Sequence, residues 1–91
     1  MSLIVVLVAR VPVEGVELFD DYERHVLPLL ADHGAALERR LRSPDRCAEV
    51  HLVSFPTPEA FAAYRADPRR VEHAPLLAES KAVIELFEFF D

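Results

Sequence analysis

The first apolar run of the chain, Leu3–Val11, is almost unbroken and rich in β-branched residues. A strand with one face in water alternates apolar and polar residues, so a continuous run predicts a strand that is covered on both faces. Pro12 follows and ends the run, because proline cannot donate a backbone hydrogen bond. We therefore expect this strand in the middle of a sheet.

The segment Gly15–His33 has the spacing of an amphipathic helix, with apolar residues at steps of three and four. These residues are Val16, Phe19, Tyr22, Val26, Leu27, Leu29 and Leu30. Pro28 lies inside the segment and should kink the helix or weaken one turn. Gly34 should end it, because glycine adopts the left-handed conformation of a helix cap without strain.

Two strands are predicted next. Ala35–Arg42 alternates loosely and indicates an edge strand, and turn residues then lead into Cys47–Phe55. Along Cys47–Phe55, side chains alternate between two faces. We expect one face to meet the helices and the other to be open, with these members: Val50, Leu52 and Ser54 towards the helices, and Glu49, His51, Val53 and Phe55 on the open face.

The second half of the chain begins with helix-start residues. Thr57 is a suitable N-cap and Pro58 suits the first helical position. The helix should end at Asp67-Pro68, because a residue before proline avoids helical angles. Arg69–Glu79 predicts a short irregular helix interrupted at Pro75, and Ala82–Phe90 predicts a final strand with Glu85 and Glu88 on opposite faces.

The order strand, helix, strand, strand, helix, strand favours an α+β fold. We predict a ferredoxin-like βαββαβ sandwich, with an antiparallel sheet in the order 4-1-3-2 and both helices on one face. Residues 1–91 are expected to form a single domain. The first strand is apolar on both faces, so the face without helices requires another cover, which we expect to be a second chain.

Composition narrows the partners. Hydrophobic residues make up 52% and charged residues 29%, which is typical of a folded chain. The net charge of −6 argues against nucleic acid or an anionic membrane as the main partner. Leu3–Ala9 is too short to span a bilayer and lacks signal-peptide features. Cys47 is the single cysteine, which excludes an internal disulfide and fits the cytoplasm.

Two segments carry a family resemblance: YERHVLPLLADHGA (Tyr22–Ala35) and VSFPTPEAFAAYRADP (Val53–Pro68). With the element order, they resemble the dimeric α/β-barrel superfamily, closest to small bacterial members of unknown function and to antibiotic-biosynthesis-monooxygenase-like proteins. The resemblance implies a homodimer whose sheets meet face to face around a small cavity. Its members include cofactor-independent monooxygenases, haem-degrading enzymes, lactone isomerases, polyketide cyclases and ligand-sensing domains, so fold alone does not choose a function.

His51 is the leading candidate for chemistry, because a histidine in an apolar strand can move protons near neutral pH. Glu49, two residues earlier, could orient its ring or raise its pKa, and Phe55 shares this face. The alternative is that His51 only bonds across a dimer interface. Substitution His51→Leu is expected to keep the dimer and its melting temperature within a few degrees, and to weaken ligand binding at least roughly tenfold, a loss of about 1.4 kcal/mol.

Tyr22 and His25 lie three residues apart on the first predicted helix and could line an entrance to a cavity; alternatively, they border the core. His33 is expected to act near a helix end, and His73 to lie on the surface.

No pair of histidines has metal-ligand spacing, and no glycine-rich phosphate loop is present, so we expect no metal, flavin or haem. The functional expectation is a cofactor-independent monooxygenase, isomerase or cyclase-like enzyme. It would act on an aromatic or polyketide-type substrate, with His51 as acid/base and Tyr22, His25, Glu49 and Phe55 binding the ligand. The alternative is a non-enzymatic ligand-binding or interaction module.

Overall fold

The computed structural model describes residues 2–91. The elements, in chain order, are β1 (Leu3–Arg10), the 3-10 helix η1 (Val13–Gly15), α1 (Val16–Val26), the 3-10 helix η2 (Leu27–His33), β2 (Ala36–Arg42), β3 (Ala48–Phe55), α2 (Pro58–Ala66), α3 (Pro68–Glu72), α4 (Ala74–Ser80) and β4 (Val83–Phe90).

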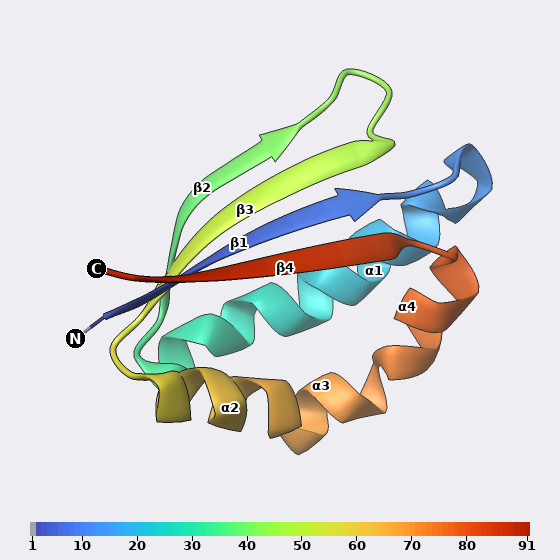
Figure 1. Ribbon diagram of the computed structural model, residues 1–91. Helices are drawn as coiled ribbons and strands as arrows, with labels where there is room; N and C mark the ends of the chain where they lie inside the picture. Colours follow the sequence, from blue (N-terminus) through green and yellow to red (C-terminus); the bar gives the residue numbers. More distant parts are fainter. Residues whose placement is uncertain (1) are drawn as a thin grey trace.

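The four strands form one antiparallel sheet in the order β2-β3-β1-β4. Read from the other edge, this is the predicted order 4-1-3-2, and the ferredoxin-like α+β fold is confirmed. The helices all cover one face of the sheet, as Figure 1 shows, and β1 lies between β3 and β4. The described helices include none that is long and apolar enough to cross a membrane.

The first helical segment changes type near its proline. α1 ends at Val26, and the chain continues as η2 with Pro28 in its first turn. Gly34 then adopts φ 70°, and the N–H groups of Gly34 and Ala35 donate to the carbonyls of Ala31 and Leu30. The predicted weakening at Pro28 and the predicted cap at Gly34 are both confirmed.

The second helical segment is built from three short helices. Thr57 Oγ1 accepts the N–H of Ala60 at 3.0 Å, which confirms the N-cap of α2. Asp67 ends α2, and its carboxylate accepts the N–H of Arg69 at 2.9 Å at the start of α3. The predicted interruption of the next helix lies at His73 rather than at Pro75, which takes a place in the first turn of α4.

The predicted faces of β3 were wrong. Its buried residues are Glu49, His51, Val53 and Phe55, and they face the helices. Phe55 packs on the rings of Phe61 and Tyr64 in α2, with centroids 4.9 and 5.7 Å apart. The prediction placed the uncharged residues Val50, Leu52 and Ser54 against the helices. It failed because Glu49 and His51 neutralise each other's charge and can therefore be buried.

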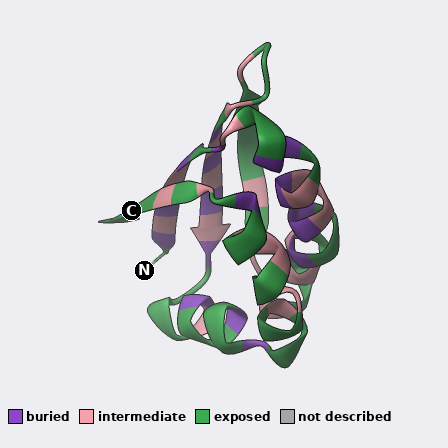
Figure 2. Ribbon diagram, turned by 90° about the vertical axis from the view of Figure 1, so that its right-hand side faces the viewer, coloured by how far each residue is buried: buried purple, intermediate pink, exposed green. Residues whose placement is uncertain are grey.

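The core has two apolar clusters of buried residues. Figure 2 colours the buried residues of the strands and helices purple. One contains Leu3, Val5, Leu30, Val53, Phe55, Phe61 and Tyr64. The other contains Ala9, Val11, Val16 and Phe19. Along β1, Leu7 lies between these clusters and is paired with His51 of β3. His51 therefore occupies the middle of the covered face.

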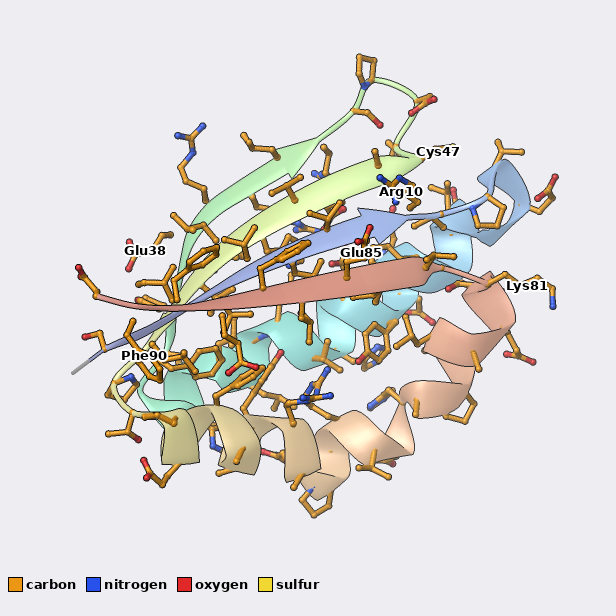
Figure 3. All side chains as sticks on the ribbon, viewed as in Figure 1. Arg10, Glu38, Cys47, Lys81, Glu85 and Phe90 are labelled. Carbon is orange, nitrogen blue, oxygen red and sulfur yellow. The ribbon has the colours of Figure 1, made fainter. Side chains whose placement is uncertain are left out.

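We call the opposite side of the sheet the open face. It carries Ile4, Val6, Val8, Val50, Leu52, Phe87 and Phe89, as the strand register requires. Phe87 and Phe89 are 47% and 54% exposed. At one end, Arg10 donates to Glu85 across β1 and β4 at 3.0 Å (Figure 3). Glu85 and Glu88 lie on opposite faces, as predicted: Glu85 is on the open face and Glu88 on the covered one.

Candidate functional site

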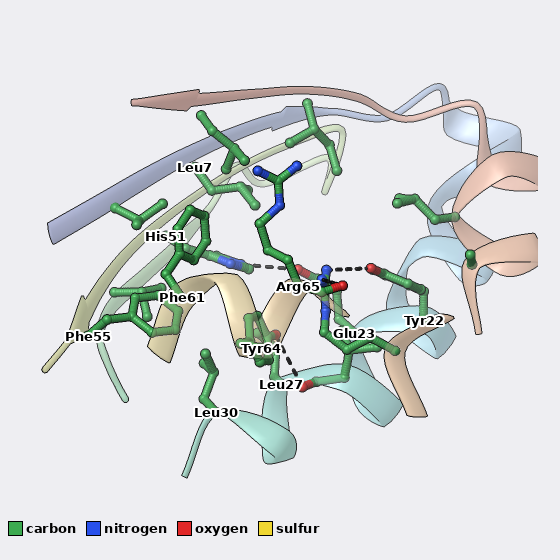
Figure 4. Close-up of a pocket in the computed structure, with 18 of the residues that line it drawn as sticks. Leu7, Tyr22, Glu23, Leu27, Leu30, His51, Phe55, Phe61, Tyr64 and Arg65 are labelled. Atoms are coloured by element: carbon green, nitrogen blue, oxygen red, sulfur yellow. Dashed lines mark hydrogen bonds and ion pairs between the residues drawn. The ribbon is translucent and has the colours of Figure 1, made fainter. Parts of the chain in front are cut away.

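A cavity of about 470 Å³ lies between the covered face of the sheet and the helices (Figure 4). Most of its wall is apolar, with side chains from β1, β3, β4 and every α-helix. Its polar lining consists of Tyr22, Glu23, His51, Tyr64, Arg65 and Arg70. An apolar wall with a few converging polar groups is the usual form of a small-molecule site.

His51 belongs to a group of ionisable residues that we call the charged cluster: Glu23, Arg40, Glu49 and His51. Nε2 of His51 contacts the carboxylate of Glu49 and lies 3.1 Å from Oε2 of Glu23. Arg40 donates to both carboxylates, at 3.2 Å to Glu49 and 3.0 Å to Glu23. The cluster therefore joins β2, β3 and α1 through four paired side chains.

The charged cluster fixes the protonation of His51. Burial alone lowers the pKa of His51, but hydrogen bonds to Glu23 and Glu49 outweigh it and raise the pKa to about 9. Burial also raises the pKa of Glu49, yet His51 and Arg40 hold it at about 2. His51 is thus an imidazolium at neutral pH and can donate a proton, whereas the sequence suggested a group that titrates near neutrality.

Glu23 differs from Glu49 in its proton affinity. Burial raises the pKa of Glu23, and the nearby carboxylate of Glu49 reinforces that effect against His51. Glu23 also lines the cavity, whereas Glu49 is not among its lining residues. A carboxylate of increased basicity therefore stands 3.1 Å from a protonated imidazole at the same wall.

A cation could find ligands in this group. Donor atoms of Glu23, Glu49 and His51 all lie within 4.8 Å of one another. However, two carboxylates already balance His51 and Arg40, and a divalent ion replacing the His51 proton would leave a buried excess of one positive charge. The expectation of a metal-free protein stays a prediction, which elemental analysis of purified protein checks.

Aromatic and arginine side chains form another part of the wall. Nη2 of Arg70 donates to the hydroxyl of Tyr22 at 2.8 Å, and its guanidinium lies 4.5 Å from the ring centre of Tyr64. Tyr64 donates to the carbonyl of Val26 at 3.3 Å. Burial raises the pKa of Tyr64 to about 12, so its phenol stays neutral. Arg65 extends from α2 towards the sheet (Figure 4).

Of the residues proposed from sequence, His51, Phe55 and Tyr22 line the cavity, and Glu49 contacts His51. His25 is separated from them: it lies on the exposed side of α1 and stacks on His73, with ring centres 4.1 Å apart. The cavity found in this chain lies on the helix side of the sheet. The cavity between two sheets that the resemblance implies stays a prediction.

Glu23, Arg40, Arg65 and Arg70 were missed by the sequence analysis. Glu23 is on the apolar side of an amphipathic helix, where an acidic residue is unusual. This position could have identified Glu23 as a candidate site residue from the sequence. His33 was expected to act only at a helix end, but its Nε2 also lies 2.8 Å from Oδ2 of Asp67, between η2 and α3.

The fold and the cavity define a ferredoxin-like α+β protein with an internal small-molecule-sized space. No family model and no curated protein matches the chain. Similar solved structures are numerous, and all those compared below are less than 25% identical, so they establish the fold alone.

A protein from Nitrosomonas europaea, provisionally assigned as an antibiotic biosynthesis monooxygenase, has a TM-score of 0.80 and 15% identity, over 98% of this chain and 97% of its own. A dimeric ferredoxin-like protein of unknown function from Jannaschia has a TM-score of 0.78 and 16% identity, over 100% of both chains. SnoaB, a cofactor-independent oxygenase from Streptomyces nogalater, has a TM-score of 0.74 and 20% identity, over 99% of this chain and 92% of its own.

Proposed function

We propose that the protein binds a small apolar or aromatic molecule in the cavity and acts on it as a cofactor-independent enzyme, of the monooxygenase, isomerase or cyclase kind. One observation carries this proposal: Glu23 and His51, 3.1 Å apart, stand together at the wall of an otherwise apolar space. The likeness in fold to SnoaB, a cofactor-independent oxygenase, supports the same class.

The step that these reactions share is the movement of a proton. Glu23 would accept a proton from an activated C–H or O–H group of the ligand, because its pKa is raised. The imidazolium of His51 would stabilise the negative charge on the ligand and return a proton to it. Glu49 and Arg40 would hold both groups in place, as paired carboxylates and guanidinium groups do.

Proton exchange on a bound ketone tests this step directly. We expect the protein to accelerate deuterium uptake from D₂O at the benzylic carbon of 2-tetralone, followed by NMR. Glu23→Gln should reduce that acceleration at least tenfold while 2-tetralone still binds. Equal exchange rates with and without protein would overturn the enzymatic proposal.

A ligand-binding module without chemistry is the second candidate. The complete internal pairing of the charged cluster favours it, since such a network also serves to join β2, β3 and α1. In that case 2-tetralone binds but its exchange is not accelerated. The two candidates therefore differ in one measured rate.

We also propose a homodimer, formed through the open face. The apolar residues there are exposed in a single chain, and a sheet face of this kind normally needs a cover. The Jannaschia protein of the same fold is dimeric.

The free thiol of Cys47 supports a reducing compartment, the cytoplasm.

A further inference from the structure

Most arginines of the described chain have a carboxylate within 4.0 Å. Five of them do: Arg10, Arg24, Arg40, Arg46 and Arg69. Among residues 2–91, four others lack such a partner: Arg39 and Arg42, which are exposed on the edge strand β2, and Arg65 and Arg70, which line the cavity. The two arginines of the described chain that lack a carboxylate partner and lie away from the edge strand are therefore both at the cavity wall.

Arg70 makes only neutral contacts within the described chain. It donates to the hydroxyl of Tyr22 at 2.8 Å and to the carbonyl of Arg65 at 3.4 Å, and it lies over the ring of Tyr64. Its Nε is buried and has no hydrogen-bond partner. A guanidinium that is partly withdrawn from water without an anion is costly, and a buried donor without an acceptor adds to that cost.

The cavity wall is therefore positive, although the chain carries a net charge of −6. The charged cluster contributes nothing to this excess, because its two carboxylates balance Arg40 and His51. Arg65 and Arg70 remain, on adjoining helices α2 and α3. Positive charge gathered at a cavity against the net charge of the molecule indicates a site for an anion.

We propose that the cavity binds an aromatic acid, with its ring against the apolar side chains and its anionic oxygen on the guanidinium groups of Arg70 and Arg65. This inference rests on the proposed function, because it names the class of ligand for the same cavity. Arg70 supplies the partly buried charge, and Arg65, which is exposed, meets the same anion from the solvent side. A carboxylate or a phenolate provides the shared chemistry of a charged oxygen.

Calorimetric titration with matched ligands tests the inference. We expect 2-naphthoate to bind at least tenfold more tightly than methyl 2-naphthoate, which has the same ring without the charge. A preference for 4-nitrophenol at pH 8, where it is ionised, over pH 6, where it is not, would identify a phenolate as an equivalent ligand; His51 stays protonated at both pH values. A constant affinity for 4-nitrophenol would assign the site to carboxylates.

Arg70→Met should weaken 2-naphthoate binding at least tenfold and leave binding of the methyl ester within twofold. Arg42→Met removes an unpaired arginine outside the described lining and should change neither affinity. If Arg70→Met unfolds, as judged by circular dichroism, Arg65→Met serves instead. The exposed side chain of Arg65 has no carboxylate partner among residues 2–91 and lies over the ring of Phe61, so its removal should leave the fold intact. A threefold or larger loss of affinity for the acid alone is expected.

Two results would contradict the inference in distinguishable ways. Equal affinities for the acid and the ester, or an equal loss of both in the arginine variants, would overturn the anion site while the proposed function stands. Failure of both compounds to bind at millimolar concentration would overturn the anion site and the proposed aromatic ligand together.

Discussion

At the scale of single residues, the charge on His51 depends on its neighbours rather than on its place in a strand. The pKa of His51 is about 9 in the folded chain, against an ordinary value of 6.5. Its ion pairs therefore stabilise the fold fully below pH 6.5, and this contribution is lost as the pH rises through 9. The pKa of Glu49 is held at about 2, below its ordinary value of 4.5. Its carboxylate therefore stabilises the fold above pH 4.5, and this contribution is lost as the pH falls towards 2.

The first prediction follows from these directions. The free energy of unfolding should fall as the pH rises from 6.5 to 9, and His51→Gln should remove most of that dependence because it has no proton to lose. Urea unfolding at several pH values in this range measures both slopes. Parallel slopes for the wild type and His51→Gln would contradict the assignment of this titration to His51.

The second prediction concerns His51→Leu. From sequence alone, the change was expected to leave the dimer intact and to weaken only ligand binding. The structure alters that expectation, because the variant leaves Glu23 and Glu49 buried with Arg40 as their shared cation. We expect a loss of about 3–5 kcal/mol in unfolding free energy, measured by urea denaturation.

His25→Leu is the matched control for that substitution. Its ring is on the exposed side of α1, so the change should alter the unfolding free energy by no more than about 0.5 kcal/mol. If His51→Leu were as mild as His25→Leu, the charged cluster would contribute little to the fold.

Residue-level prediction from sequence reached His51 because a polar side chain stood out in an apolar strand. It did not reach Glu23 or Arg40, since their meeting with His51 depends on how α1 is rotated against the sheet and on the β2–β3 register, which shifts between Leu37 and Arg39. No spacing of residues in the sequence predicts long-range packing of this kind.

At the scale of elements, prediction was stronger because the signals are local. Proline, glycine and capping residues act within one turn, so the strands, the cap at Thr57 and the end at Gly34 were found where the structure has them. The two faces of β3 were not assigned correctly, because each face holds a set of residues that could be buried. The choice depends on which side chains of the helices meet them, such as Glu23 of α1.

The third prediction concerns the junction of α1 with α4. A Cβ atom on Gly15 would lie 1.9 Å from the backbone oxygen of Ser80, so a side chain there must push the two helices apart. Gly15→Ala should lower the unfolding free energy by about 1–3 kcal/mol, as overpacking does. Thermal unfolding followed by circular dichroism provides the measurement.

Gly34→Ala is a comparison variant in which the loss of stability has a different cause. Gly34 has φ 70°, and its Cβ would meet only the side chain of Pro56, at 3.3 Å, so the cost there is mainly conformational and about 1–2 kcal/mol. A melting temperature of Gly15→Ala equal to that of the wild type would show that α4 is not held against α1 as described.

At the scale of the whole molecule, the two faces of the sheet have different roles. The covered face forms a cavity within one chain, whereas the open face presents exposed apolar side chains. The sequence predicted an interface with Val53 and Phe55, but these residues face the helices. The interface that we propose instead centres on Val6, Leu52 and Phe87, which pair across the centre of the open face.

The fourth prediction is that the protein is a dimer in solution, with twice the chain mass of 10.3 kDa by light scattering at micromolar concentration. Val6→Glu should give a monomer, because it places a charge at the centre of the proposed interface. Val13→Glu, the same change at a 70% exposed position outside the sheet, should remain a dimer. A wild-type monomer would overturn the proposal.

The same variant separates assembly from ligand binding. Since the cavity lies on the helix side of the sheet and Val6 is on the opposite face, the Val6→Glu monomer should bind 2-naphthoate within about threefold of the dimer, less than 1 kcal/mol. Calorimetry on both forms makes the comparison. If affinity instead disappears with the dimer while the monomer stays folded by circular dichroism, the ligand lies between two sheets, and the cavity beneath the helices is not its site.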